Sequence, residues 1–415
     1  MKSICKYALI VLALLLLATE VQACTGLVID AGSGKPLAGA LVTRGKDVLT
    51  TGADGRYAFP GTCATVAARA IGYSRASVMP PDGESAPTMR LATIRPKALY
   101  LSFWGIGHQG LRDAALDLIE RTELNALVID VKGDRGGIPY PTTVAMADAV
   151  GARHTTTVAD MGKLLAQLRE KHIYLIARIV VFKDDPFAKA HPEWAVRTAG
   201  GALFHDREEL AWIDPSRQEA WNYSLDLAVD AARLGFDEIQ FDYVRFPDTP
   251  GLVFSVANTE ANRIAAISGF LAAARQRLLP YNVFVAADIF GYVFWNTNDT
   301  QIGQKLEVLI NRLDYLSPML YPSGFKFGIP GYPNPVANPY EIVYLTLKHG
   351  LERSGIAPLR LRPWIQGFRD YAFDHRAFDG PEIRQQIDAA EKLGTNGWML
   401  WNPRNTYSAD GLGKK

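Results

Sequence analysis

The sequence lacks the motifs of several common enzyme classes. Its seven histidines form no H-E-x-x-H or H-x-H pair, although spacings of this kind are typical of catalytic zinc sites. It also has neither the G-x-S-x-G turn of serine hydrolases nor the G-x-x-x-x-G-K-[ST] loop that cradles phosphates. We therefore expect chemistry that uses no metal and no bound cofactor.

An excess of charge of either sign is also missing. The 415 residues carry a formal net charge of +1, and removal of residues 1–23 would leave a neutral chain because that segment contains two lysines and one glutamate. Nucleic acids and anionic membrane surfaces are bound by basic patches, so neither is expected as a partner. A neutral saccharide or peptide substrate fits this composition better than a polyanion.

Long apolar runs are absent except at the start of the chain. Residues 8–18 are nearly all Leu, Ala, Ile and Val and follow two lysines, but this run is too short to span a bilayer. The small residues around 21–23 suit cleavage by a signal peptidase. We expect a signal peptide over 1–23, a secreted or periplasmic mature protein, and no transmembrane segment in that mature chain.

Cysteine is scarce, with three in the whole chain. Cys5 lies in the expected signal peptide, which leaves Cys24 and Cys63 in an exported protein, where two cysteines most simply form one disulfide. The alternative is a lipoprotein with a lipid anchor at Cys24, although Gln22 fits a lipid-attachment motif poorly. A paired thiol cannot act as a nucleophile, so cysteine catalysis is not expected.

Residues 24–95 have many turn signals and few helix signals. SGKPLAGALV (33–42) and TGADGRYAF (51–59) read as turns and strands, with the D-G dipeptide of the second as a hairpin turn. Together with AARAIGY (67–73), these segments resemble the carboxypeptidase regulatory-like domain, a transthyretin-like fold. The resemblance implies a small N-terminal all-β sandwich domain that accompanies a catalytic domain and carries no catalysis itself.

From residue 96 the pattern becomes strand, helix, strand, helix to the end of the chain. The expected strands are 98–104, 125–131, 173–181, 237–244, 283–289, 314–320, 362–368 and 396–401. The expected helices lie near 110–122, 158–171, 216–234, 258–279, 300–312, 339–354 and 380–393. This alternation predicts an α/β fold, a (β/α)8 TIM barrel over residues 96–415. A doubly wound parallel sheet is the alternative.

One glycine motif points elsewhere. Residues 105–110, GIGHQG, match the G-x-G-x-x-G pattern of dinucleotide-binding proteins, and Asp130 follows at about the distance of twenty residues that the pattern requires. That pattern needs a sheet whose strand order reverses, whereas eight regular βα units close into a barrel. We therefore expect no nicotinamide or flavin site.

The most informative stretch is residues 235–247, GFDEIQFDYVRFP. It reads as a helix end, a short strand and a polar strand-exit loop, and alternation places Gln240 and Asp242 on the same face of the strand. A carboxylate on a buried strand is unfavourable unless it is paired or used. In a barrel of parallel strands, chemistry is found at the carboxyl ends of the strands. The alternative is a structural aspartate satisfied by Arg245.

The same alternation predicts that polar and aromatic side chains of the other strands converge with Asp242 at one end of the barrel. The candidate catalytic residues are Asp130, Asp242 and Asp288. The candidate substrate-binding residues are Lys132, Arg178, Gln240, Tyr243, Arg245, Tyr321, Trp364, Gln366, Trp398 and Asn402. Each has a structural interpretation when taken alone, since a strand-end aspartate often caps a helix. Their convergence is what indicates a site.

This inventory suits cleavage of a glycosidic bond, which needs one carboxylic acid to protonate the departing oxygen and one carboxylate to attack or to activate water. Neighbouring strands run about 5 Å apart, so Asp242 and Asp288 can face one sugar ring. Nearby cations would keep one carboxylate ionised, while an apolar wall would raise the pKa of the other. Tryptophans offer flat faces for sugars, although core packing is an equally good interpretation of any single one.

Residues 97–405 resemble the putative glycoside hydrolase domain family of bacterial TIM-barrel proteins. The segments that carry the resemblance are TELNALVIDVK (122–132), AWIDP (211–215), LGFDEIQFDYVRFP (234–247) and SPMLYP (317–322). The resemblance implies an exported enzyme that hydrolyses O-glycosyl bonds of a polysaccharide or oligosaccharide, with Asp242 as the nucleophile. In similar glycosidase barrels the acid on the fifth strand is often Glu, whereas this sequence has Asp288 there. The alternative is a non-catalytic carbohydrate-binding or envelope-assembly protein on the same scaffold.

Overall fold

The structure is a computed structural model that describes residues 23–79 and 88–415. The expected signal peptide lies, apart from its last residue, outside the described residues. Within the part of the chain that is described, no helix is long and apolar enough to cross a membrane.

The chain divides into two compact units. Among the described residues, the first contains those from 23 to 70, 76 to 79 and 88 to 92, and the second contains Ile71–Arg75 and Thr93–Lys415. A five-residue segment between two strands of the first unit therefore belongs to the second unit.

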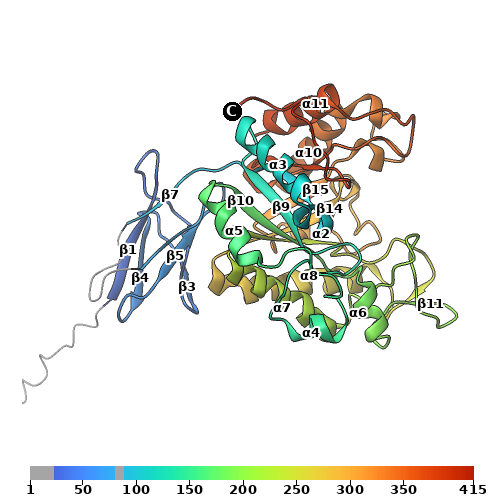
Figure 1. Cartoon of the computed structure of the whole chain (residues 1–415), viewed down its shortest axis with the longest axis horizontal. Coiled ribbons are helices and arrows are strands. Elements are labelled where there is room, and N and C mark those ends of the chain that lie inside the picture. The colour runs from blue at the N-terminus through green and yellow to red at the C-terminus, as the bar shows by residue number, and fades with distance from the viewer. Residues whose placement is uncertain (1–22, 80–87) are drawn as a thin grey trace, which may run out of the picture. The chain divides into compact units, whose positions relative to one another are not determined.

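The first unit consists of short strands in two small sheets (Figure 1). The strands are β1 (Ala23–Asp30), β2 (Leu41–Arg44), β3 (Asp47–Thr50), β4 (Arg56–Pro60), β5 (Val66–Arg69), β6 (Ala76–Val78) and β7 (Met89–Leu91). Their orders are β4-β1-β7 and β3-β2-β5-β6. The predicted D-G hairpin is wrong, because the turn with Gly55 at φ +71° joins β3 and β4, which lie in different sheets. It is instead a crossover between sheets.

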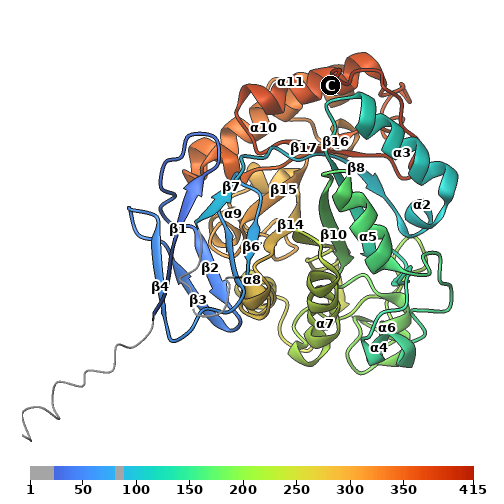
Figure 2. The same ribbon diagram turned by 60° about the vertical axis from the view of Figure 1, so that its left-hand side comes forward.

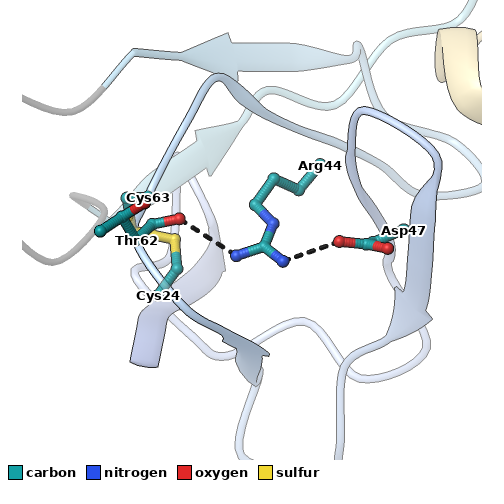
Figure 3. Close-up of a disulfide and its surroundings, with 5 residues drawn as sticks. All are labelled: Cys24, Arg44, Asp47, Thr62 and Cys63. Carbon is teal, nitrogen blue, oxygen red and sulfur yellow. Dashed lines mark hydrogen bonds and ion pairs between the residues drawn. A yellow bond between two sulfur atoms is a disulfide. The ribbon is translucent and has the colours of Figure 1, made fainter. Parts of the chain in front are cut away.

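The two remaining cysteines form the predicted disulfide, Cys24–Cys63 (Figure 3). The sulfur of Cys24 is therefore unavailable for a lipid anchor in this state. Beside the disulfide, Arg44 donates a hydrogen bond to the carbonyl of Thr62 at 3.1 Å and another to the carboxylate of Asp47 at 2.7 Å. The disulfide joins residues 39 positions apart in the sequence and therefore restricts the conformations of the unfolded chain.

The second unit is a closed barrel of eight parallel strands, which confirms the predicted (β/α)8 fold (Figure 2). The strands are β8 (Lys97–Leu101), β9 (Ala126–Lys132), β10 (Tyr174–Val180), β12 (Glu238–Asp242), β14 (Phe284–Phe290), β15 (Tyr315–Met319), β16 (Trp364–Gln366) and β17 (Trp398–Trp401). They follow one another around the barrel in chain order, and β17 closes it by pairing with β8. A short pair, β11 (Arg197–Thr198) and β13 (Leu252–Val253), lies in the connections.

Helices alternate with these strands and pack around the barrel (Figure 1, Figure 2). They are α2 (Phe103–Gly107), α3 (Gln109–Arg121), α4 (Ala145–Ala149), α5 (Met161–Glu170), α6 (Asp185–Ala190), α7 (Gln218–Leu234), α8 (Glu260–Leu278), α9 (Leu306–Leu309), α10 (Pro339–Ser354) and α11 (Gly380–Lys392).

Two predicted elements differ from the structure. The first barrel strand ends at Leu101 because Ser102 caps α2, its hydroxyl accepting a hydrogen bond from the backbone N–H of Gly105 at 3.1 Å. The helix expected near 300–312 shrinks to one turn, α9. Asp299 explains this, since its carboxylate accepts backbone hydrogen bonds from the turn that follows it.

The glycine motif at 105–110 is a packing feature. A Cβ on Gly105 would lie 2.0 Å from the side-chain oxygen of Asn405, and one on Gly107 would lie 2.3 Å from Thr157. The space beside these two glycines is therefore filled by the protein's own side chains, which leaves no room there for a ligand. The closed barrel also has no reversal of strand order, which removes the basis of the dinucleotide interpretation.

The amino-terminal end of the barrel interior holds a fully buried ion pair. Arg362 on the segment before β16 donates to both carboxylate oxygens of Glu238 at 2.7 and 2.6 Å, and neither side chain has any exposed surface. Tyr174 donates a further hydrogen bond to Glu238 at 3.0 Å, and the guanidinium of Arg362 lies 4.4 Å from the centre of the Tyr315 ring. No pattern in the sequence indicates this pair.

The segment Ile71–Arg75 packs against this end of the barrel. Ile71 contacts the apolar cluster inside the barrel, which includes Tyr174, Tyr315 and Trp364 and is called the inner apolar cluster below. The backbone N–H of Gly72 donates to the hydroxyl of Tyr315 at 3.1 Å. Arg75 is paired with Asp237 at 2.9 Å, at the start of β12. The segment thus completes the barrel core, so the domain boundary expected at residue 96 does not coincide with the boundary of the compact unit.

Replacement of Ile71 by Asp should destabilise the barrel. A charge placed against the inner apolar cluster has no partner there, and we expect a loss of about 3 kcal/mol in the free energy of unfolding. All eight tryptophans lie in the barrel unit, so urea unfolding followed by tryptophan fluorescence measures that unit selectively. Ser77→Asp, an exposed position on β6, is the matched control. Equal midpoints for both variants would contradict the structural role of the segment.

Candidate active site

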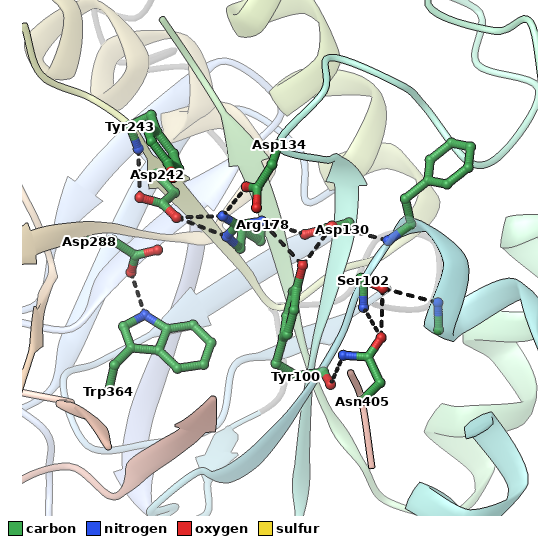
Figure 4. Close-up of polar contacts among 12 residues, drawn as sticks. Tyr100, Ser102, Asp130, Asp134, Arg178, Asp242, Tyr243, Asp288, Trp364 and Asn405 are labelled. Atoms are coloured by element: carbon green, nitrogen blue, oxygen red, sulfur yellow. Dashed lines mark hydrogen bonds and ion pairs between the residues drawn. The ribbon is translucent and has the colours of Figure 1, made fainter. Parts of the chain in front are cut away.

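Arg178 on β10 is the centre of a buried carboxylate cluster (Figure 4). Register places it opposite Asp130 on β9 and Gln240 on β12. Its guanidinium donates to Asp130 at 2.8 Å, to Asp134 at 2.6 Å and twice to Asp242, at 2.6 and 3.0 Å. One arginine therefore links three carboxylates, two from β9 and the loop that follows it and one from β12.

Asp242 and Asp288 are neighbours across two adjacent strands. Phe241 lies opposite Ala287 in the register of β12 and β14, so the next residue of each strand extends the pairing. The indole N–H of Trp364 donates to Asp288 at 2.7 Å. Burial raises the pKa of Asp288 well above its usual range, and the Asp242 carboxylate raises it further by repulsion and by a hydrogen bond between the two groups.

The environments of the two carboxyl groups therefore differ. Asp288 is favoured in its protonated form by burial, whereas Asp242 accepts hydrogen bonds from a permanently charged arginine and from the backbone N–H of Tyr243 at 2.6 Å. A pair of carboxyl groups with opposed environments is what acid–base chemistry requires.

A strained turn follows Asp242, the last residue of β12. Tyr243 has φ +48°, in the left-handed region that a residue with a side chain rarely adopts. Such a conformation is unfavourable by roughly 1–3 kcal/mol and is often found at functional sites. Here it turns the chain so that the backbone N–H of Tyr243 reaches the carboxylate of the preceding residue.

Asp130 is buried next to Tyr100. Its second oxygen accepts hydrogen bonds from the hydroxyl of Tyr100 at 2.9 Å and from the backbone N–H of Phe103 at 3.0 Å. Trp401 stacks on Tyr100 with ring centres 4.0 Å apart. Burial raises the pKa of Asp130 to about 6, although Arg178 acts in the opposite direction. This carboxyl group can thus change protonation near neutral pH.

Three further predicted residues face the barrel interior. Tyr321 lies close enough to Asp288 and Asp242 for their charges to add to the effect of burial, and its pKa is raised well above its usual range. Gln240 and Gln366 are fully buried and hold Ser317 and Ser323 by hydrogen bonds of 2.9 and 2.8 Å. These two amides support the wall of the barrel.

Arg245 and Tyr243 lie on the loop after β12. The guanidinium of Arg245 packs among the rings of Trp212, Tyr243 and Phe290, at 4.9, 5.2 and 4.6 Å from their centres. It donates to the carbonyl of Phe246 at 3.0 Å and makes no ion pair with Asp242. The alternative in which Arg245 satisfies Asp242 is therefore wrong, because Arg178 takes that role.

The structure places Lys132 outside the barrel interior, contrary to prediction. A register irregularity beside Arg178 and Ile179 puts Lys132 opposite Ile179, on the face that packs against α7. There its ammonium group pairs with the buried carboxylate of Asp184 at 2.5 Å and contacts Ser224 at 3.3 Å.

Simple alternation also predicts the wrong positions for Trp398 and Asn402. Pairing of Trp364 with Met399 sets the phase of β17, so that Met399 faces inward and Trp398 packs in the outer core beneath α11. Asn402 is a loop residue whose amide donates to the carbonyls of Gly367 and Thr406, each at 2.8 Å. Neither side chain joins the carboxylate cluster.

Asp134 and Tyr100 belong to the cluster but were not predicted as site residues, and Trp401, one of the tryptophans expected to offer a flat face for a sugar, stacks on Tyr100. Asp134 lies on the loop that directly follows β9, and its side chain is 37% exposed. A search of strand-exit loops, as well as of strand faces, would have found it. Tyr100 points into the barrel from β8, and the alternation of that strand would have identified it.

The cluster holds no evident metal-ligand set. Among the residues that the structure describes, no three His, Cys, Asp or Glu side chains are arranged to bind a metal ion. The acidic side chains instead use Arg178, Tyr100 and Trp364 as partners.

Comparison with known proteins adds a family and a fold. Residues 98–407 match a family model described as "Putative glycosyl hydrolase domain". No curated protein matches the chain. The glycoside hydrolase domain of PgaB (BpsB) from Bordetella bronchiseptica is 14% identical with a TM-score of 0.53, over 75% of this chain and 94% of its own. That similarity shows a shared barrel fold.

Two other solved structures are similar at lower TM-scores. A hypothetical protein from Ruminiclostridium thermocellum is 36% identical with a TM-score of 0.42, over 46% of this chain and 96% of its own. A chitinase from Chromobacterium violaceum is 13% identical with a TM-score of 0.45, over 74% of this chain and 93% of its own.

Proposed function

This chain belongs to the putative glycosyl hydrolase domain family, and from that membership we propose that it is an exported glycoside hydrolase that cleaves a glycosidic bond in a polysaccharide. Asp242 and Asp288 are the two carboxyl groups of the reaction. The single observation that carries the proposal is their opposed environment on adjacent strands: burial and the neighbouring Asp242 raise the pKa of Asp288, and Arg178 donates hydrogen bonds to Asp242.

In the proposed mechanism, the protonated Asp288 gives its proton to the departing glycosidic oxygen. Asp242 either removes a proton from the water that attacks the anomeric carbon, or attacks that carbon itself. In the second route, water then hydrolyses the glycosyl ester of Asp242, with the deprotonated Asp288 as the base. Arg178 orients Asp242 through its two hydrogen bonds and carries the positive charge that balances the cluster. Trp364 orients Asp288 by its indole N–H.

Export is proposed from two features. The apolar amino-terminal run has the composition of a signal peptide, and a disulfide such as Cys24–Cys63 persists in oxidising compartments. The first unit is proposed to be a carboxypeptidase regulatory-like module that contributes no catalytic group.

The function is tested by release of new reducing ends. The mature protein, residues 24–415, is incubated with bacterial exopolysaccharides, peptidoglycan and plant glycans, beside the variants Asp242→Asn and Asp117→Asn. We expect product from wild type, a loss of about a thousandfold in Asp242→Asn, and normal turnover in Asp117→Asn, whose carboxylate is 64% exposed on α3.

Other outcomes have definite meanings. Equal product from wild type and Asp242→Asn would move the catalytic residue elsewhere in the barrel. Saccharide binding without product from any panel member, and unchanged by loss of Asp242 and Asp288, would favour a binding or envelope-assembly protein over an enzyme.

A further inference from the structure

A line of aromatic rings leads from the carboxyl pair to the surface. Tyr321 follows β15 and lies beside Asp288 and Asp242. Its ring meets Phe368, after β16, with centres 5.5 Å apart, and Phe368 in turn stacks on Tyr371 with centres 6.1 Å apart and an angle of 11° between the planes. We call Tyr321, Phe368 and Tyr371 the aromatic track.

The outer end of the track is exposed. Tyr371 keeps 63% of its surface accessible, although a large aromatic side chain gains from burial. Its ring is nearly parallel to that of Phe368, and its exposed surface is available to contact another flat, partly apolar surface. The pyranose ring of a sugar, with its axial C–H groups, has such a surface.

The loop that carries Phe368 and Tyr371 is held in place by Asp370, which is itself buried. Its carboxylate accepts hydrogen bonds from the hydroxyl of Ser323 at 2.6 Å and from the backbone N–H groups of Ala372, Phe373 and His375 at 3.1, 2.9 and 2.9 Å. Although burial alone would raise the pKa of Asp370, these bonds lower it to about 2. The carboxylate thus remains ionised and the loop stays fixed across the physiological pH range.

The loop is also tied to the barrel. Gln366, the last residue of β16, donates to Ser323 at 2.8 Å and to the carbonyl of Phe368 at 3.0 Å. A ring that is already fixed in position loses little conformational entropy when a ligand stacks on it. Tyr371 is therefore exposed on a loop that is fixed in position, as a contact surface for a ligand would be.

We propose that the aromatic track binds consecutive sugar residues of a polysaccharide chain and guides that chain to Asp242 and Asp288. The inference rests on the proposed function, because the ligand class is taken from it, and it adds the residues that hold the polymer beyond the cleaved bond. The track is continuous with the carboxyl pair and contains no charged side chain, which suits a neutral saccharide.

The test is affinity electrophoresis of the mature protein in native gels that contain glycol chitin, carboxymethyl cellulose, xylan or pullulan. Wild type should be retarded by at least one of these gels. Tyr371→Ala should raise the apparent dissociation constant about tenfold, the effect expected for loss of one stacked ring, whereas Tyr371→Phe should bind as wild type does.

Phe327→Ala is the matched control. Phe327 is 84% exposed, but its ring neighbours Tyr292 at 6.4 Å and does not join the track, so its removal should leave retardation unchanged. Equal retardation of Tyr371→Ala and wild type would overturn the proposal, as would absence of retardation of wild type in all four gels. Wild type separates the two proposals. If it is retarded, Tyr371→Ala is not, and no reducing ends are released, the track is kept and the catalytic proposal is contradicted.

Discussion

Replacement of Asp288 by Asn should lower turnover of the polysaccharide about a thousandfold, and should leave kcat/KM for an activated aryl glycoside nearly unchanged. The natural leaving group is an alcohol, which departs only when an acid protonates it. A 2,4-dinitrophenolate leaves without a proton. The measurement compares both substrates in wild type, Asp288→Asn and Asp242→Asn, and the last variant should lose both activities because Asp242 acts on the sugar itself.

The pH dependence provides a second readout of the same assignment. In wild type, turnover of the polysaccharide should fall as the pH rises through the raised pKa of Asp288, because a general acid is active only below its pKa. With the dinitrophenyl substrate, Asp288→Asn should show no such fall. If Asp288→Asn lost activity equally toward both substrates, the role of Asp288 as the acid would be contradicted.

Replacement of Arg362 by Met should destabilise the barrel by about 3–5 kcal/mol. The variant leaves the Glu238 carboxylate in a site without exposed surface, where its remaining donor is the hydroxyl of Tyr174. Burial of an uncompensated charge is the reason for the large effect. The measurement is urea unfolding followed by tryptophan fluorescence.

Two controls separate charge from packing at this position. The double variant Glu238→Gln with Arg362→Met removes both charges and should recover most of the lost stability. Arg121→Met breaks an ion pair with Asp117 whose side chains are 54% and 64% exposed, and this should change stability by less than about 1 kcal/mol. If Arg362→Met unfolded at the wild-type midpoint, the buried pair would not contribute as argued.

The barrel and part of its site could be predicted from the sequence because they depend on local periodicity. Alternation along each strand is a property of the extended backbone, and it correctly placed Asp130, Arg178, Asp242 and Asp288 on the inner face. The disulfide could also be predicted, since only two cysteines remained to form it.

Register decided which side chains left or joined the cluster. A single irregularity between β9 and β10 turns Lys132 toward Asp184, and pairing with β16 gives β17 the phase that excludes Trp398. These shifts arise from hydrogen bonds to neighbouring strands, and one residue of slip reverses the direction of every side chain that follows.

The amino acid sequence by itself determined the repeating strand–helix pattern, the inward carboxylates and the disulfide. Only the tertiary structure decided their partners: that Arg178 links Asp130, Asp134 and Asp242, that Glu238 meets Arg362 across 124 positions of sequence, and that Ile71–Arg75 completes the barrel core. The reason is physical. Backbone geometry imposes the period of each strand locally, whereas a contact between distant residues exists only after all eight strands have closed into one barrel.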